Sequence, residues 1–174
     1  MSSPQYPLTS GIHWYERVID KINLLQPVLL LLLRLYIGYE AMVSGWAHLH
    51  NIDKTTEFFA SLNIPMPRLN VYIAGYTELV GGALLLVGLA SRIVAVPFTF
   101  NFLIAILSVN LTDPKFREML KNILHNQDVV LKDDAFPFFF VGLLILIFGP
   151  GALSIDGLLK RTLFRRQKAV SPAT

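Results

Sequence analysis

The chain of 174 residues has no cysteine and few charged residues, and both shortages narrow what it can do. Without cysteine it has no disulfide, thiolate nucleophile, iron–sulfur cluster or cysteine zinc site of its own, so redox chemistry would need a bound cofactor or a partner. Charged residues make up 16% of the sequence and hydrophobic residues 53%, and the mean hydropathy is +0.53. This composition is typical of a chain whose main solvent is lipid.

The net charge of +3 does not indicate nucleic-acid binding, because the basic residues gather at the tails and short loops and form no basic face. Basic residues near span ends favour the cytoplasmic side. The N-terminal segment, Arg92 and the C-terminal tail share one side of the predicted topology. We therefore expect a protein of the bacterial inner membrane with both termini in the cytoplasm, and the first apolar run is too long for a cleavable signal peptide.

Four apolar segments approach the roughly 20 residues that a helix needs to cross a hydrocarbon core of about 30 Å. They are Leu24–Ala47, Leu69–Ala90, Ile93–Leu111 and Phe136–Ile155. Polar groups inside lipid need partners within the protein, so four antiparallel helices should pack together. The predicted fold class is an all-α membrane protein with a four-helix transmembrane bundle over residues 24–155.

Amphipathic segments flank the predicted bundle. Residues 1–23 and the basic tail 156–174 combine apolar and basic residues at helical spacing, which indicates helices at the membrane surface. Thr112-Asp113-Pro114 resembles a helix start, so residues 114–125 should form a further interfacial helix. Between the first two spans, Asp53–Leu62 should form a short helix that ends before Pro65.

Two charges lie near the middle of predicted spans, Arg34 in the first and Glu78 in the second. A charge at that depth is costly unless it is paired or faces a polar interior. Since these spans are antiparallel, we predict a buried ion pair between Arg34 and Glu78. Small residues at helical spacing should let the same two helices approach closely, namely Gly38, Gly45, Gly75 and Gly82. Two interpretations stay open: a purely structural pair, or a site that binds a ligand or moves protons.

Glu40 is a second acid within the first span, about 120° around the helix from Arg34. Either it is protonated and bonded to Tyr36, or it meets a quinone or a cation from a partner. Asn101 on the third span could extend this polar interior, so Tyr36, Glu40 and Asn101 form the predicted quinone or proton site. His48 and His50 have no third ligand close in sequence, so we predict no metal site and expect interfacial hydrogen bonds.

Several motifs, in order along the chain, resemble the DoxX family of small four-span membrane proteins. They are Arg34 with Gly38 and Gly45, Phe59–Pro65, Glu78–Gly82 with Arg92, and Phe148–Asp156. The similarity runs from about Pro27 to Leu159. It implies a last helix that ends at Gly149-Pro150. The sequence departs from the family at His48 and Asn110, where lysine and histidine are frequent, and in a longer polar insertion from Thr112 to Asp134.

The resemblance implies a membrane-anchored partner in redox systems, since the family includes the membrane subunit of a thiosulfate:quinone oxidoreductase and proteins of oxidative-stress complexes. Our leading hypothesis is a non-catalytic accessory subunit of a larger membrane complex, in contact with lipid and with other subunits. The alternatives are a quinone-binding subunit of an oxidoreductase, and a carrier of protons or small solutes.

Overall fold

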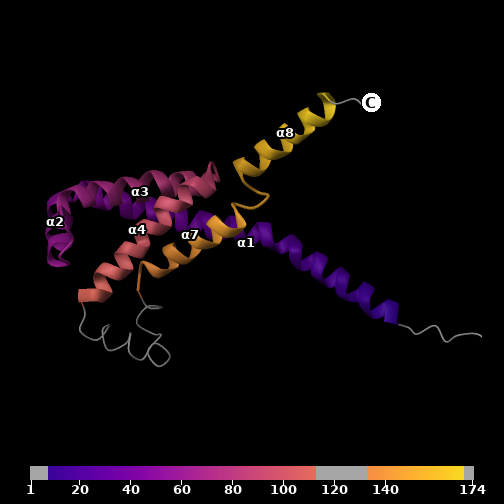
Figure 1. The fold of residues 1–174 in the computed structure, drawn as a ribbon, viewed down its shortest axis with the longest axis horizontal. Coiled ribbons are helices and arrows are strands. Elements are labelled where there is room, and N and C mark those ends of the chain that lie inside the picture. Colours follow the sequence, from indigo (N-terminus) through magenta and orange to yellow (C-terminus); the bar gives the residue numbers. More distant parts are fainter. Residues whose placement is uncertain (1–7, 113–132, 171–174) are drawn as a thin grey trace, which may run out of the picture.

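The computed structural model describes residues 8–112 and 133–170, and throughout these ranges the regular structure is helical, with no strand. The helices, in chain order, are α1 (Leu8–His50), α2 (Ile52–Ser61), α3 (Pro67–Val87), α4 (Ser91–Thr112), α7 (Phe136–Phe148) and α8 (Ile155–Val170). Parts of α1, α3, α4 and α7 pack together, α2 lies at one end, and α8 leaves from the other (Figure 1). We call these the α2 end and the α8 end of the bundle.

Within the part of the chain that the structure describes, three stretches are long and apolar enough to cross a membrane: Leu25–His50, Pro67–Val87 and Ser91–Val109. Large apolar side chains on them face outward, such as Leu32, Ile73 and Ile93, which is how helices meet lipid. The fold class predicted from sequence, an all-α membrane protein, is confirmed.

The fourth apolar helix is shorter than predicted. α7 has 13 residues, which is about 20 Å of helix, whereas Phe136–Ile155 was expected to be one span. The helix stops at Phe148 because Gly149 adopts a positive φ of 81° and Pro150 follows, and a proline cannot continue the helical hydrogen bonds. α7 nevertheless packs along α4 within the bundle.

The first helix is longer than predicted. Residues 1–23 were expected to form a separate interfacial segment, but α1 continues without interruption from Leu8 through Pro27 to His50, about 65 Å in all. Its N-terminal part projects from the bundle at the α8 end (Figure 1). The short helix expected over Asp53–Leu62 is present as α2, and the basic tail is helical as far as Val170. The predicted helix 114–125 lies outside the described residues.

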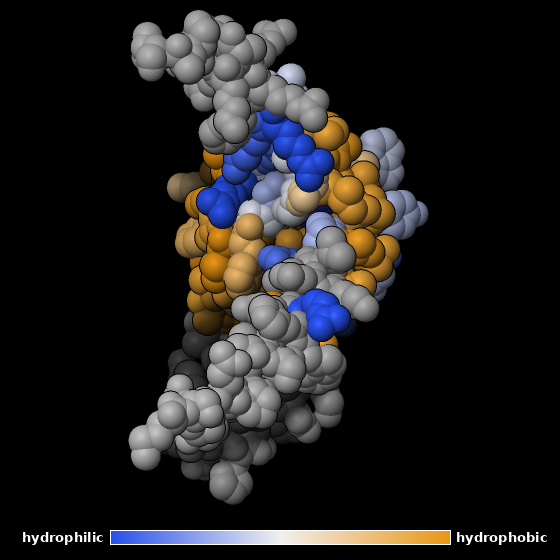
Figure 2. All heavy atoms as spheres, turned by 90° about the vertical axis from the view of Figure 1, so that its right-hand side faces the viewer, coloured by the Kyte–Doolittle hydropathy of each residue, from blue (hydrophilic) through white to orange (hydrophobic). Residues whose placement is uncertain are grey.

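The core forms where the four apolar helices meet. α1 contributes Ile37 and Ala41, and the other members of the buried cluster are Leu85, Ala95, Phe98, Phe102, Val141 and Ile145. Phe102 stacks on Phe138, with ring centroids 4.6 Å apart, which ties α4 to α7. Figure 2 looks onto the α8 end and shows hydrophilic residues in its middle with hydrophobic surface along both flanks.

Glycine brings α1 and α3 into backbone contact. A Cβ built on Gly38 would lie 2.8 Å from the carbonyl oxygen of Gly82, and one on Gly45 would lie 2.5 Å from that of Gly75. No larger residue fits such spacings without moving a backbone. The four glycines chosen from their spacing therefore lie along this one antiparallel contact, which fixes the register of α1 against α3.

Candidate functional site

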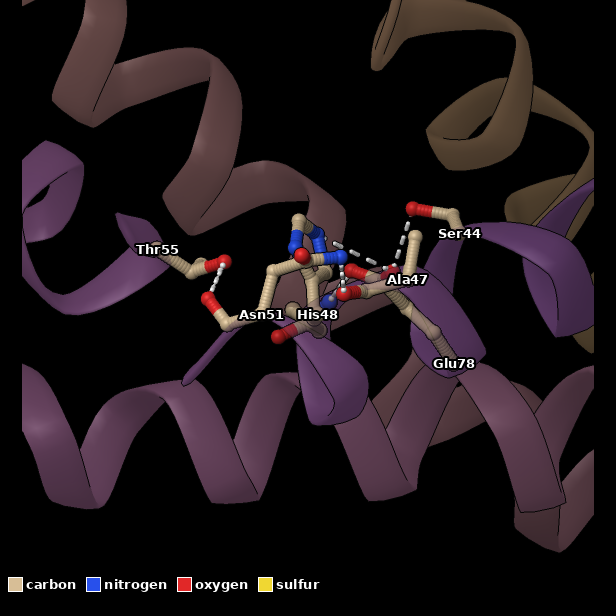
Figure 3. Close-up of polar contacts among 7 residues, drawn as sticks. Ser44, Ala47, His48, Asn51, Thr55 and Glu78 are labelled. Atoms are coloured by element: carbon tan, nitrogen blue, oxygen red, sulfur yellow. Dashed lines mark hydrogen bonds and ion pairs between the residues drawn. The ribbon is translucent and has the colours of Figure 1, made fainter. Parts of the chain in front are cut away.

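A cluster of polar side chains surrounds Glu78, where α1, α3 and α4 meet. Glu78 is only 4% exposed. The Ser44 hydroxyl donates to its Oε2 at 2.8 Å, and the Asn101 amide Nδ2 donates to its Oε1 at 3.0 Å. His48 Nε2 lies 3.5 Å from Oε2 (Figure 3). Both carboxyl oxygens thus have partners inside the bundle.

Helical spacing and close packing together create this cluster. Ser44 and His48 are four residues apart, so they share one face of α1. Between them Gly45 lets α3 approach: the Glu78 Cβ would lie 2.9 Å from a Cβ at that position. Asn101 reaches the same carboxyl from α4. The site is therefore a product of the glycine contact between α1 and α3.

His48 lies between the buried carboxyl and the α2 end. It belongs to the last turn of α1, and its side chain is 30% exposed. Its ring meets Phe59 of α2 edge-on, with centroids 6.2 Å apart. Just beyond, Asn51 donates to the Ala47 carbonyl at 2.9 Å and Thr55 donates to the Asn51 carbonyl at 2.9 Å (Figure 3). These bonds hold the connection from α1 to α2 beside the histidine.

This arrangement is suited to hold or exchange a proton. An ionised Glu78 can accept all three contacts, whereas a protonated Glu78 can donate to His48 or to a ligand. Among the side chains that the structure describes, no group of three or more histidine, aspartate or glutamate residues could hold a metal ion.

Arg34 and Glu78 do not form the predicted ion pair. The Arg34 side chain is 1% exposed, and its Nη2 donates to the Leu153 carbonyl at 2.6 Å. The register of α1 against α3 keeps the two charges apart. Of the α1 side chains that meet Glu78, Ser44 is the nearer in sequence to Arg34, yet it lies ten residues after Arg34, about 15 Å along the helix axis.

Arg34 instead belongs to a second polar cluster at the α8 end. A Cβ on Gly88, where φ is 73°, would overlap Arg34 Nη1. Asp156 lies in the first turn of α8, accepts hydrogen bonds from the backbone N–H groups of Ala90 and Ser91 at 2.8 Å each, and interacts electrostatically with Arg34. Burial pushes the pKa of Asp156 up, but the N–H groups of Ser91 and Ala90 and the nearby Lys160 lower it below its usual value.

The three residues of the predicted quinone or proton site are not brought together. Asn101 joins Glu78, whereas Tyr36 is 64% exposed on the outer face of α1. Glu40 is half-buried and makes no hydrogen bond or ion pair in the described part of the chain. The site predicted from sequence did not include Ser44 and His48, which lie four and eight residues after Glu40. Their spacing beside Gly45 could have placed them against the α1–α3 contact instead.

Comparison with known proteins agrees with this architecture. The sequence model of the DoxX family matches residues 29–111, which include Arg34 and every residue of the Glu78 cluster. "Inner membrane protein YphA" of Escherichia coli (strain K12) is 32% identical over 132 residues, which is 75% of this chain and 90% of that protein. The chain belongs to the DoxX family.

A second relative of this DoxX protein carries a redox name. "Putative oxidoreductase CatD" of Bacillus subtilis (strain 168) is 37% identical over 84 residues, or 48% of this chain, and the match spans 61% of the length of CatD. No solved structure gives a significant match. Asp156 and α8 lie beyond the residues that the family model covers, whereas the Glu78 cluster lies wholly within them.

Proposed function

We propose that this DoxX-family protein is an accessory subunit of a redox or electron-transfer complex in the bacterial inner membrane, with both termini in the cytoplasm. The names of CatD and YphA support the redox and inner-membrane parts of the proposal. The accessory role is supported above all by the shape of the α8 end, where α1 and α8 extend beyond the packed helices (Figure 1). Apolar side chains there are uncovered by the described part of the chain, with Tyr15 61% and Leu158 59% exposed.

Mild solubilisation of native membranes tests this proposal. The tagged protein should co-purify with at least one stable membrane partner, and Leu158→Glu with Leu159→Glu should abolish the association by placing charges on α8. Lys54→Glu is the matched control, because Lys54 is exposed at the opposite end. A native protein that migrates alone would overturn the accessory role.

A second candidate function is quinone binding at the Glu78 cluster. A quinone carbonyl could accept a hydrogen bond from Asn101 or from a protonated Glu78, and Glu78 could supply the proton that accompanies reduction. Electrons would come from a partner, since the chain has no cysteine to hold an iron–sulfur cluster. What favours this function is that Ser44, His48 and Asn101 all converge on one buried carboxyl.

Quinone extraction tests the second candidate. Purified wild-type protein should retain quinone, and Glu78→Gln should lower its quinone content, whereas Tyr36→Phe, a change on the outer face of α1, should not. Equal quinone in wild type and Glu78→Gln, or none in either, would exclude this site.

A further inference from the structure

We infer that Glu78 is a proton-binding site with access from one side, and that His48 connects it to water at the α2 end. Three environments follow one another over a short distance: the buried carboxyl of Glu78, the partly exposed ring of His48, and the water at the α2 end. Glu78 is 4% exposed, His48 Nε2 is 3.5 Å from its Oε2, and the His48 side chain is 30% exposed. The histidine is therefore in contact both with the buried carboxyl and with the outside.

The other neighbours of Glu78 do not provide an equivalent route. Ser44 and Asn101 hold its two oxygens, but neither titrates in the physiological range. Towards the α8 end, α1 and α3 close on each other: a Cβ on Gly82 would lie 2.7 Å from the Gly38 carbonyl oxygen and 3.1 Å from the Ala41 Cβ. Proton exchange from that end would have to pass this tightly packed contact.

Few charged groups stand near the path. α1 contributes His48 and α3 contributes Glu78, while α4 faces the site with Asn101 and α2 with Phe59, which do not titrate. At the surface of the α2 end, Asp53 and Arg68 form an exposed pair at 3.7 Å, with side chains 89% and 67% exposed. Because water screens that pair, it acts only weakly on the site, and His48 is the histidine in contact with Glu78.

A proton can pass from water through His48 to Glu78 in two steps. Neutral His48 takes a proton from water on Nδ1, and the resulting imidazolium gives the proton on Nε2 to Glu78 Oε2. This leaves a neutral carboxyl and the other tautomer of neutral imidazole, which returns to its starting form by exchange with water. The reverse sequence releases the proton at the α2 end. Neither a quinone nor a partner is needed, so the inference stands if the accessory role or quinone binding fails.

Infrared spectroscopy in lipid nanodiscs tests this relay on the whole protein. The carbonyl-stretch band of a protonated carboxylic acid should be present in the wild type and disappear in Glu78→Gln. Transfer into deuterated buffer should shift the band rapidly, and His48→Ala should slow that shift on the order of 100-fold, the size typical of lost acid–base catalysis. Added imidazole should restore the rate.

Two further variants keep the result interpretable. Glu40→Gln is the matched control for an acid in the same membrane region, and it should change neither the Glu78 band nor its exchange. His48→Gln keeps a hydrogen-bonding side chain, replaces His48→Ala if that variant does not fold, and should show the same slow exchange. The inference is overturned if no band depends on Glu78, or if exchange in the His48 variants proceeds at the wild-type rate.

Discussion

The backbone N–H of Ser91 donates to Asp156 Oδ2 at 2.8 Å, although 65 residues separate the two along the chain. Asp156 thereby occupies the N-terminus of α4 from a different helix, where a negative charge and free N–H groups stabilise each other. The same residue donates its own N–H to the Gly88 carbonyl at 3.0 Å. A single aspartate thus fastens the start of α8 to the turn between α3 and α4.

Replacing Asp156 with asparagine should weaken the attachment of α8 to the turn between α3 and α4. It should also make the stability of the fold less dependent on pH. The pKa of Asp156 is lower in the folded protein than its ordinary value of 3.8. The carboxylate therefore stabilises the fold at pH values above 3.8, and this contribution is lost as pH falls through the lower folded-state pKa. Asp156→Asn should cost about 1 kcal/mol near neutral pH, and its melting temperature should fall less on acidification than that of the wild type.

Tryptophan fluorescence during heating in detergent provides the measurement for Asp156→Asn. The matched control is Asp53→Asn, since the Asp53 side chain is 89% exposed and its ion-pair partner in the described part of the chain, Arg68, is exposed too. This control should melt as the wild type does. An Asp156→Asn variant with unchanged stability at every pH would show that the contact with Ser91 does not hold α8 in place.

Adjacent glycines on α3 should respond very differently to alanine. A Cβ on Gly82 would lie 2.7 Å from the Gly38 carbonyl oxygen and 3.0 Å from the Met42 amide nitrogen, both backbone atoms of α1. Gly82→Ala should therefore push the helices apart and cost about 1–3 kcal/mol. A Cβ on Gly81 would meet side chains and no backbone, namely the Phe98 ring at 3.3 Å and Val94 at 3.7 Å, so Gly81→Ala should be near neutral. Equal melting temperatures for the two variants would contradict the backbone contact.

A hydroxyl group inside the bundle should stabilise the fold only if it has a hydrogen-bond partner. Ser44→Ala removes a donor to Glu78 and should cost about 1 kcal/mol, or more if the carboxylate is left undersatisfied. Thr99→Val is the matched control, because Thr99 Oγ1 is buried with no hydrogen-bond partner in the described part of the chain. That change should be neutral or stabilising. Thermal unfolding compares the two, and a greater loss for Thr99→Val would refute the assignment of Ser44.

The sequence predicted the helices better than the contacts between them. Long apolar runs and Pro65 were sufficient to place α2, α3 and α4 within a few residues, because hydrophobic length and helix breakers act locally. The fourth helix ends at Phe148, directly before the glycine–proline turn at which the family resemblance placed its end, whereas the apolar run had suggested a span as far as Ile155.

The contacts of Arg34 and Glu78 depend on the register of α1 against α3, which is set by packing between distant parts of the sequence. Glycine spacing identified the faces that meet, but several antiparallel registers satisfy such spacing. The register in the structure aligns Gly38 with Gly82 and Gly45 with Gly75, which places Glu78 beside Ser44 and Arg34 beside Gly88. Mid-span charges of opposite sign suggested a pair because their depth was judged from span limits alone, and a ten-residue offset is enough to separate them.

Arg34 and Glu78 serve two separate clusters at different depths of the bundle, and a double-mutant cycle measures whether they interact. Melting would be followed for Arg34→Met, Glu78→Gln and the double variant, with Ser44→Ala and Glu78→Gln as the cycle expected to couple. For Arg34 and Glu78 we expect additive losses of stability, with an interaction energy within about 0.5 kcal/mol of zero. A coupling of several kcal/mol, with the double variant no less stable than either single variant, would show that the two residues form a buried ion pair after all.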